Sequence, residues 1–188
     1  IITIVESKYH DGWRMFRMNS DTNIYLAGFM GSGKSTVAAE LAVRLGRVCL
    51  ELDDEIERRE GMPISGIFAA RGEPYFRALE KRVLESTLER RGMVISCGGG
   101  IVIDPDNIRL MEENGILICL DVTPEAAYER TRGHSHRPLL NVPDPLGRIR
   151  ELMEKRKPCY DRIRHHVDTA GGDPATIARR ICALLEAV

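Results

Sequence analysis

The segment NIYLAGFMGSGKST, residues 23–36, joins an apolar run to a glycine-rich turn and the start of a helical pattern. It satisfies the pattern G-x-x-x-x-G-K-[ST], in which glycines allow backbone amides to curl around a phosphate group. The matching residues are Gly28, Gly33, Lys34 and Ser35. The pattern lies between a predicted strand and a helical segment that runs to Leu45 and stops at Gly46, so we predict a phosphate loop.

The side chains of this phosphate loop have separate expected roles. Lys34 is predicted to bridge the outer phosphates of a nucleotide and the Ser35 hydroxyl to face magnesium, while the following helix N-terminus adds partial positive charge. The predicted ATP-binding residues of the loop are Gly31, Ser32, Gly33, Lys34, Ser35 and Thr36. The alternative is a glycine-rich turn that binds nothing. Hydrolases, switches and kinases share such a loop, so the acceptor site has to identify the reaction.

Short β-branched runs alternate with helical patterns along the rest of the chain. The runs are NIYLAG (23–28), RVCLEL (47–52), GMVISC (92–97), GILICLDV (115–122) and HHVDTA (165–170). This alternation predicts an α/β fold, with a parallel sheet covered by helices on both faces. Four predicted helix starts have a capping residue followed by proline: Asp104-Pro105, Thr123-Pro124, Asp144-Pro145 and Asp173-Pro174.

Composition limits the partners of the protein. The 188 residues, 43% of them hydrophobic, suit one compact domain. Lysines and arginines number 27 against 28 aspartates and glutamates, so no overall positive field attracts nucleic acid or an anionic membrane. The longest apolar runs are far shorter than the roughly 20 residues of a membrane helix. Five cysteines without metal-binding spacing are expected to be reduced, buried thiols: Cys49, Cys97, Cys119, Cys159 and Cys182.

Two segments lack the periodicity of the rest. Residues 1–22 are predicted to be an N-terminal extension, disordered or tag-like, although IITIV could pair as an edge strand. The domain is expected to comprise residues 23–188. Within it, GHSHRPLLNVPD, residues 133–144, is long for a loop in a compact domain and is predicted to be a moving lid.

Four further segments follow the phosphate loop in a distinctive order and spacing. They are LELDDEIERREGMPISGIFAARGEPYFRALE (50–80), VISCGGGIV (94–102), RTRGHSHRPLL (130–140) and KRKPCY (155–160). Together with the loop they resemble shikimate kinase, and the resemblance covers residues 23–188. It implies a three-layer αβα fold like that of nucleoside monophosphate kinases, with a five-stranded parallel sheet. It also implies transfer of the ATP γ-phosphate to the 3-hydroxyl of shikimate in the route to aromatic amino acids.

The resemblance also implies a cofactor, two substrates, an oligomeric state and a location. Mg²⁺ is the expected cofactor, and shikimate and ATP are the expected small-molecule substrates. We expect a monomeric, cytoplasmic enzyme with no nucleic-acid or membrane partner.

Shikimate carries a carboxylate and three hydroxyls, so its site needs cations at one end and acceptors at the other. Arg77 and Arg156 match the carboxylate-binding arginines of the family. Glu80 follows Arg77 by three residues, so both lie on one helix face, where the glutamate can hold the guanidinium in position. Asp53 matches the aspartate that binds the ring hydroxyls and aligns or deprotonates the nucleophile.

Three successive glycines, Gly98, Gly99 and Gly100, follow a predicted parallel strand. Open α/β sheets bind ligands at this end of their strands, and glycines allow the backbone to approach a small polyol closely. We expect all three to contribute to the shikimate site, with Gly99 and Gly100 as the main contacts.

The nucleotide side depends on residues later in the chain. Arg137 corresponds to the lid arginine of the family and is expected to act with Lys34 and Asp53 in catalysis by stabilising charge on the transferred group. Arg130 matches an arginine that packs on adenine, and Pro174 falls where the adenine-binding loop ends. Four histidines receive no role: His134, His136, His165 and His166.

One position departs from the family pattern. The family usually has aspartate-x-aspartate at the end of the second strand, and its first acid helps to hold the magnesium shell. This chain has Glu51, Leu52 and Asp53. Glutamate retains the charge but adds a methylene, so Glu51 is expected to contact the metal through water with shifted geometry.

Two alternatives to a shikimate kinase stay open. A related small-molecule kinase, such as a gluconate or nucleoside monophosphate kinase, would keep the fold and change the acceptor. A shikimate-kinase-like sensor domain of a transcription regulator would bind the ligand without chemistry. The two arginines and the triple glycine favour a small carboxylated polyol, and the retained Lys34, Asp53 and Arg137 favour catalysis.

Overall fold

The computed structural model describes residues 21–132 and 142–188 of the chain. All of the predicted extension except its last two residues, and most of the predicted lid, lie outside the described residues. The strands are β1 (Asn23–Gly28), β2 (Val48–Glu51), β3 (Met93–Ser96), β4 (Gly115–Asp121) and β5 (His165–Asp168). The helices are α1 (Lys34–Leu45), α2 (Leu52–Glu60), α3 (Ile64–Ser86), η1 (Ile101–Ile103), α4 (Pro105–Asn114), α5 (Pro124–Thr131), α6 (Pro145–Tyr160) and α7 (Pro174–Glu186).

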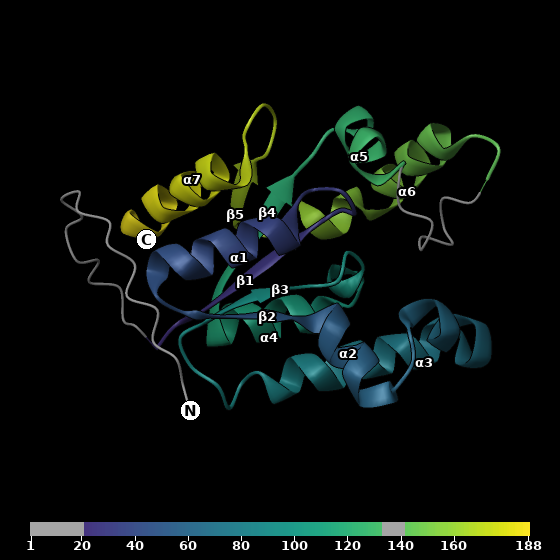
Figure 1. Ribbon diagram of the computed structural model, residues 1–188, viewed down its shortest axis with the longest axis horizontal. Coiled ribbons are helices and arrows are strands. Elements are labelled where there is room, and N and C mark those ends of the chain that lie inside the picture. The colour runs from purple at the N-terminus through teal and green to yellow at the C-terminus, as the bar shows by residue number, and fades with distance from the viewer. Residues whose placement is uncertain (1–20, 133–141) are drawn as a thin grey trace.

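The five strands form one parallel sheet in the order β2-β3-β1-β4-β5. Strand β1 is central, because Tyr25 pairs with Ile95 of β3 on one side and with Leu117 of β4 on the other. Helices α1 and α7 cover one face of the sheet, and α2, α3 and α4 cover the other (Figure 1). The predicted three-layer αβα fold is confirmed, and the carboxyl ends of all five strands meet at one edge.

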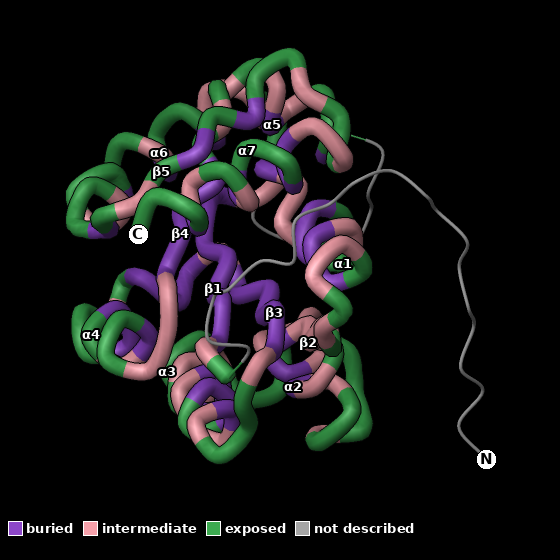
Figure 2. The backbone as a smooth tube through the Cα atoms, turned by 90° about the vertical axis from the view of Figure 1, so that its left-hand side faces the viewer, coloured by how far each residue is buried: buried purple, intermediate pink, exposed green. Residues whose placement is uncertain are grey.

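The core is divided between the two faces by the alternation of side chains along each strand. In β1, Tyr25 and Ala27 pack with α2 and α3, whereas Ile24 and Leu26 pack with α1 and α7. Figure 2 shows the buried backbone concentrated in the sheet, with exposed segments on the outer sides of the helices. Near-continuous burial of β1 is what a central parallel strand requires.

The predicted helix starts are confirmed by their capping bonds. The side chains of four residues accept backbone N–H groups in the first turns of α4, α5, α6 and α7: Asp104, Thr123, Asp144 and Asp173. Helix α1 ends at Leu45, and Gly46 adopts the left-handed conformation with φ of 62°. Its amino end differs, because Gly33 supplies no side-chain cap. The N–H groups of the first turn of α1 are therefore directed into the phosphate loop.

The structure corrects some details. Helix α3 is interrupted at Gly72, where φ is 76° and ψ is 172°, so two helical stretches meet just before Pro74. The second strand is shorter than predicted, because α2 begins directly at Leu52. Of the five cysteines, two are buried and three are only partly buried. Within residues 21–132 and 142–188, no helix is both long enough and apolar enough to cross a membrane.

Candidate active site

The phosphate loop connects the end of β1 to the start of α1. Gly31 and Gly33 have φ of 78° and 88°, in the left-handed region that favours glycine. Nζ of Lys34 donates hydrogen bonds to the carbonyl oxygens of Gly28, at 2.8 Å, and Phe29, at 3.0 Å. The ammonium group therefore lies over the loop, beside the uncapped N-terminus of α1. This arrangement concentrates positive charge where a polyphosphate would bind.

Ser35 and Glu51 meet beside the phosphate loop. The Ser35 hydroxyl donates a 3.1 Å hydrogen bond to Oε2 of Glu51, the last residue of β2. Oε1 of Glu51 is buried and has no hydrogen-bond partner in the described part of the chain. Burial raises the pKa of this carboxyl, and the Ser96 and Ser35 hydroxyls oppose the rise. A hydroxyl and a buried carboxylate form a donor set that suits a hard cation such as Mg²⁺.

Two other polar residues of the loop, Ser32 and Thr36, make hydrogen bonds to backbone carbonyl oxygens of the loop. The Thr36 hydroxyl donates to the carbonyl oxygen of Gly33 at 2.9 Å, within the first turn of α1. The Ser32 side chain is buried, and its backbone N–H donates to the carbonyl oxygen of Phe29 at 3.1 Å. Both residues therefore lie in the backbone turn that connects β1 to α1.

The triple glycine lies against the acidic and basic side chains of α2 and α3. A Cβ atom on Gly98 would meet Oε1 of Glu80 and Oδ1 of Asp53, the latter at 3.0 Å. A Cβ atom on Gly100 would collide with the guanidinium of Arg77. The carboxyl end of β3, the first turn of α2 and the second stretch of α3 therefore converge at this point.

Arg77 and Glu80 form the polar centre of this region. Nη1 of Arg77 donates to Oε2 of Glu80 at 2.7 Å, as the spacing of three residues predicted. Nη2 of Arg77 also contacts Glu73, at 3.0 Å, and the guanidinium carbon lies 5.2 Å from the Phe76 ring centroid. Burial raises the pKa of Glu80 to about 7, while the Arg77 guanidinium opposes the rise. The fold thus orients a partly exposed arginine with a buried acid.

Helix α6 brings Arg156 to the same place from the other end of the chain. Arg156 is buried, its Nη1 lies 3.4 Å from the carbonyl oxygen of Gly99, and its guanidinium carbon lies 6.0 Å from the Phe29 ring centroid. The Tyr160 hydroxyl donates to the same carbonyl at 2.6 Å. Tyr160 was missed in the sequence, because nothing in KRKPCY indicates that its hydroxyl reaches the triple glycine.

Arg130 connects the phosphate loop to the segment that follows β5. Its Nη1 donates to the carbonyl oxygen of Gly31 at 3.1 Å, and its Nη2 donates to that of Thr169 at 3.2 Å. Pro174, the first residue of α7, follows shortly after Thr169. The predicted adenine contacts of Arg130 and Pro174 stay predictions. Arg137 lies outside the described residues.

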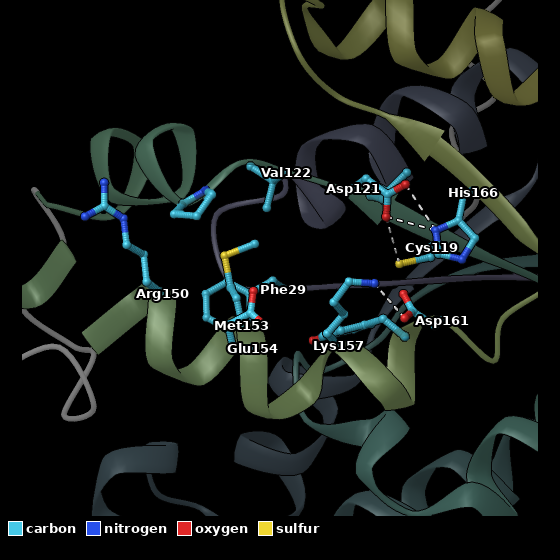
Figure 3. A pocket seen from close by; sticks show the side chains of 13 residues that line it. Phe29, Cys119, Asp121, Val122, Arg150, Met153, Glu154, Lys157, Asp161 and His166 are labelled. Atoms are coloured by element: carbon cyan, nitrogen blue, oxygen red, sulfur yellow. Dashed lines mark hydrogen bonds and ion pairs between the residues drawn. The ribbon is translucent and has the colours of Figure 1, made fainter. Parts of the chain in front are cut away.

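A separate cleft of about 690 Å³ adjoins these residues (Figure 3). It lies between the carboxyl end of β4 and α6, and Phe29 and Tyr160 are among its lining residues. None of the described residues that the sequence assigned to the active site lines it. His166, which received no role, lines the cleft with Cys119 and Asp121.

Comparison with known proteins gives consistent matches over most of the chain. A family model described as shikimate kinase matches residues 30–186. Shikimate kinase of Persephonella marina is 46% identical over 159 residues, which cover 85% of this chain and 96% of that protein. The solved structure of shikimate kinase from Acinetobacter baumannii in complex with shikimate has a TM-score of 0.85 and 36% identity, covering 88% of this chain and 93% of that one.

A more distant structure shares only the fold. A gluconokinase from Sinorhizobium meliloti has a TM-score of 0.56 and 18% identity over 88% of this chain and 95% of that one.

Proposed function

This chain belongs to the shikimate kinase family, and on that premise we propose which of its residues bind the two substrates. The protein is an ATP-dependent kinase that transfers the γ-phosphate of ATP to the 3-hydroxyl of shikimate, giving shikimate 3-phosphate and ADP. ATP binds with its phosphates at the phosphate loop. Shikimate binds between α2, α3 and α6, against the triple glycine. The observation that carries this assignment is the convergence of Asp53, Arg77 and Arg156 on Gly98–Gly100.

The cationic end of the site binds the shikimate carboxylate. Arg77 and Arg156 come from different helices and lie against the same glycine segment, so both guanidinium groups can bind one carboxylate. Glu80 holds Arg77 through the 2.7 Å bond, which leaves other N–H groups of the guanidinium to the substrate. The Arg77 guanidinium is therefore oriented before the substrate binds, and this lowers the entropic cost of binding.

The opposite end of the site carries out the chemistry. Asp53 accepts a hydrogen bond from the 3-hydroxyl of shikimate, orients its oxygen toward the γ-phosphate and accepts its proton as transfer proceeds. Lys34, at the phosphate loop, stabilises the negative charge on the transferred group. The dipole of α1 acts in the same direction. Little covalent chemistry is required of the protein, because positioning and charge stabilisation account for most phosphoryl-transfer catalysis.

Ser35 and Glu51 are the residues that would hold Mg²⁺. Their adjacent hydroxyl and carboxylate oxygens, one of them buried without a hydrogen-bond partner among the described residues, support this proposal. When bound, Mg²⁺ would neutralise phosphate charge. The Ser35–Glu51 hydrogen bond keeps both groups beside the phosphate loop.

The remaining assignments are extensions of the family resemblance. Arg130 is proposed to pack on adenine, since its bonds to Gly31 and Thr169 hold it between the phosphate loop and the segment before Pro174. Arg137 is proposed to cover the phosphates from the lid. The monomeric state and the cytoplasmic location stay predictions.

An assay of ADP release tests the proposed acceptor. Purified protein with ATP and Mg²⁺ is given shikimate, quinate, gluconate or a nucleoside monophosphate in parallel. Rapid ADP release with shikimate alone supports the proposal. Faster release with gluconate or a nucleoside monophosphate would show that the acceptor is a different alcohol. Shikimate binding in calorimetry with no ADP release would indicate the ligand-sensing alternative.

A further inference from the structure

Three side chains that the kinase reaction does not use meet at one end of the cleft beside α6. Cys119 and Asp121 are two residues apart on β4, so they project from the same face of the sheet. His166 of β5 is the register partner of Cys119 in the parallel ladder. The pairing of β4 with the edge strand β5 therefore brings a thiol, a carboxylate and an imidazole together, as Figure 3 shows.

The three groups lie close enough to reach one metal ion. Sγ of Cys119 lies 3.5 Å from Oδ1 of Asp121, and Nδ1 of His166 lies 2.9 Å from the same oxygen. All three ligand atoms lie within 4.8 Å of one another. Tetrahedral zinc with ordinary bond lengths requires separations of roughly 3.3–3.6 Å between ligand atoms. Small side-chain adjustments would therefore admit the ion.

Both ring nitrogens of His166 face oxygen atoms. Nε2 lies 3.0 Å from the carbonyl oxygen of Ile163, and Nδ1 lies 2.9 Å and 3.1 Å from the two carboxylate oxygens of Asp121. With Nε2–H donating to Ile163, Nδ1 can direct its lone pair to a metal ion that Asp121 also binds. A backbone carbonyl on the second ring nitrogen is the usual partner of a metal-binding histidine.

The charges around the cleft are compatible with a cation. Lys157 and Arg150, the basic residues that line it, are already paired, the first with Asp161 at 2.6 Å and the second with Glu125 at 2.8 Å. Glu154 adds a further carboxylate to the lining. Cys119, Asp121 and His166 all line the cleft, so it leaves room for water to complete the coordination of a bound ion.

We propose that Cys119, Asp121 and His166 bind a zinc ion whose fourth ligand is a water molecule from the cleft. Sulfur and imidazole nitrogen favour zinc over the magnesium of the kinase reaction, which prefers oxygen ligands such as those of Ser35 and Glu51. Binding releases the proton of the Cys119 thiol. Burial raises the pKa of Cys119, so the thiol keeps its proton until the metal replaces it.

The site also lies next to the nucleotide side of the enzyme. The carbonyl oxygen of Asp121 accepts hydrogen bonds from the backbone N–H of Thr169, at 3.1 Å, and from its hydroxyl, at 2.7 Å. Thr169 in turn accepts the bonds of Arg130, which reaches Gly31. An ion at Cys119, Asp121 and His166 would therefore brace the ends of β4 and β5, which Thr169 and Arg130 connect to the phosphate loop.

Cobalt is a suitable probe, because thiolate bound to Co²⁺ gives a near-ultraviolet charge-transfer absorption that an oxygen site lacks. We expect the metal-free full chain to bind one equivalent of Co²⁺ with this absorption, and Zn²⁺ but not excess Mg²⁺ to displace it. Zn²⁺ should also raise the melting temperature, because it binds the folded state alone. Cys119→Ser should abolish the absorption, and His166→Ala and Asp121→Asn should weaken metal affinity by about 10-fold or more.

The controls are Cys182→Ser and His165→Ala, which change the same residue types outside the cluster and should bind metal as the natural chain does. His166→Ala alters a partly exposed edge-strand residue, so it keeps the test decisive if Cys119→Ser does not fold. Absence of thiolate charge transfer in the natural chain would overturn the proposal and leave only a contact between the His166 and Asp121 side chains. Unchanged Co²⁺ binding in folded His166→Ala would overturn it as well.

Discussion

Nη1 of Arg77 lies 2.7 Å from Oε2 of Glu80, and the two side chains differ sharply in exposure. The Arg77 side chain is 27% exposed, whereas that of Glu80 is 1% exposed. Oε1 of Glu80 has no hydrogen-bond partner within residues 21–132 and 142–188. The guanidinium is therefore the main group that stabilises the ionised form of a buried acid, and the acid fixes the direction of the guanidinium.

Arg77→Ala is expected to make stability fall more steeply with pH than in the natural chain, where the pKa of Glu80 is already raised to about 7. Without the cation, the pKa of Glu80 rises further above the 4.5 of an unperturbed glutamate. In the window above that value, folded Glu80 keeps a proton that the unfolded chain has lost, so the stability of the variant falls as pH rises. The loss at about pH 8 should be roughly 1–3 kcal/mol, the cost of an unpaired buried group. Urea unfolding at about pH 5 and pH 8 measures it.

The control for this prediction is the double variant Arg77→Ala, Glu80→Gln. Glutamine is neutral at both pH values, so the difference between them should largely disappear. An equal loss of stability at both pH values in the single variant would mean that Arg77 acts through packing, for example on Phe76, and not through the charge of Glu80.

Arg156→Ala and Arg77→Ala should each weaken shikimate binding. Each removes a charged partner of the substrate carboxylate, worth on the order of 1.5–3 kcal/mol or about 10- to 150-fold in affinity. ATP binding should change little. Calorimetry with each substrate measures both effects, and Arg150→Ala, which alters an arginine of the same helix α6 paired with Glu125, should change neither. Equal loss of nucleotide binding would assign these arginines to the phosphate site.

Gly100→Ala should selectively raise the Michaelis constant for shikimate. The new methyl group would overlap the Arg77 guanidinium, so the guanidinium must move away from the site. The constant for ATP should stay near that of the natural chain. Gly66→Ala is the matched control, because its nearest neighbours would lie at an ordinary 3.7 Å and alanine favours the helix. Unchanged shikimate kinetics in Gly100→Ala would show that the position of Arg77 is not critical.

Local features of the fold could be predicted well. The aspartates and threonine before proline form capping bonds within a few residues of themselves, so their structure depends on local sequence alone. The interruption of α3 at Gly72 was missed, although the sequence G-E-P offered the signal of a glycine two residues before a proline.

Contacts between distant segments were predictable only through the family resemblance. That resemblance placed Arg77, Arg156 and the triple glycine in one site, but it gave no sign that Tyr160 bonds to Gly99. The pairing of Cys119 with His166 depends on the register of β4 and β5, which no local pattern encodes. The spacing of the cysteines along the chain gave no sign of a metal site, whereas the pairing of β4 with β5 brings Cys119 and His166 together.

Lys34→Ala should abolish phosphoryl transfer and leave the fold intact. The lysine supplies positive charge at the phosphates, and its Nζ bonds backbone carbonyl oxygens, those of Gly28 and Phe29, so the substitution removes no apolar side chain from the core. ADP release measures the activity, and circular dichroism with thermal melting measures the fold. A variant that keeps most of the natural turnover would contradict the assignment of the phosphate loop.

The two acids at the end of β2 should respond differently to substitution. Glu51 contacts Ser35 beside the phosphate loop, whereas Asp53 lies against Gly98 beside Glu80. Glu51→Asp shortens the side chain by one methylene and restores the residue usual in the family. Activity should stay within a few-fold of the natural chain, with any change appearing in the Mg²⁺ concentration required. ADP release titrated with Mg²⁺ measures this.

Asp53→Asn should lower turnover more than binding. Asparagine keeps the size and some hydrogen bonding of aspartate but cannot accept the proton of the 3-hydroxyl, so turnover should fall by roughly 10²-fold or more. Shikimate affinity should fall less, because Arg77 and Arg156 still bind the carboxylate. ADP release at saturating shikimate gives the turnover, and calorimetry gives the affinity. An active Asp53→Asn enzyme beside an inactive Glu51→Asp enzyme would reverse the roles of the two acids, because the group next to the triple glycine would then not be the one that handles the proton.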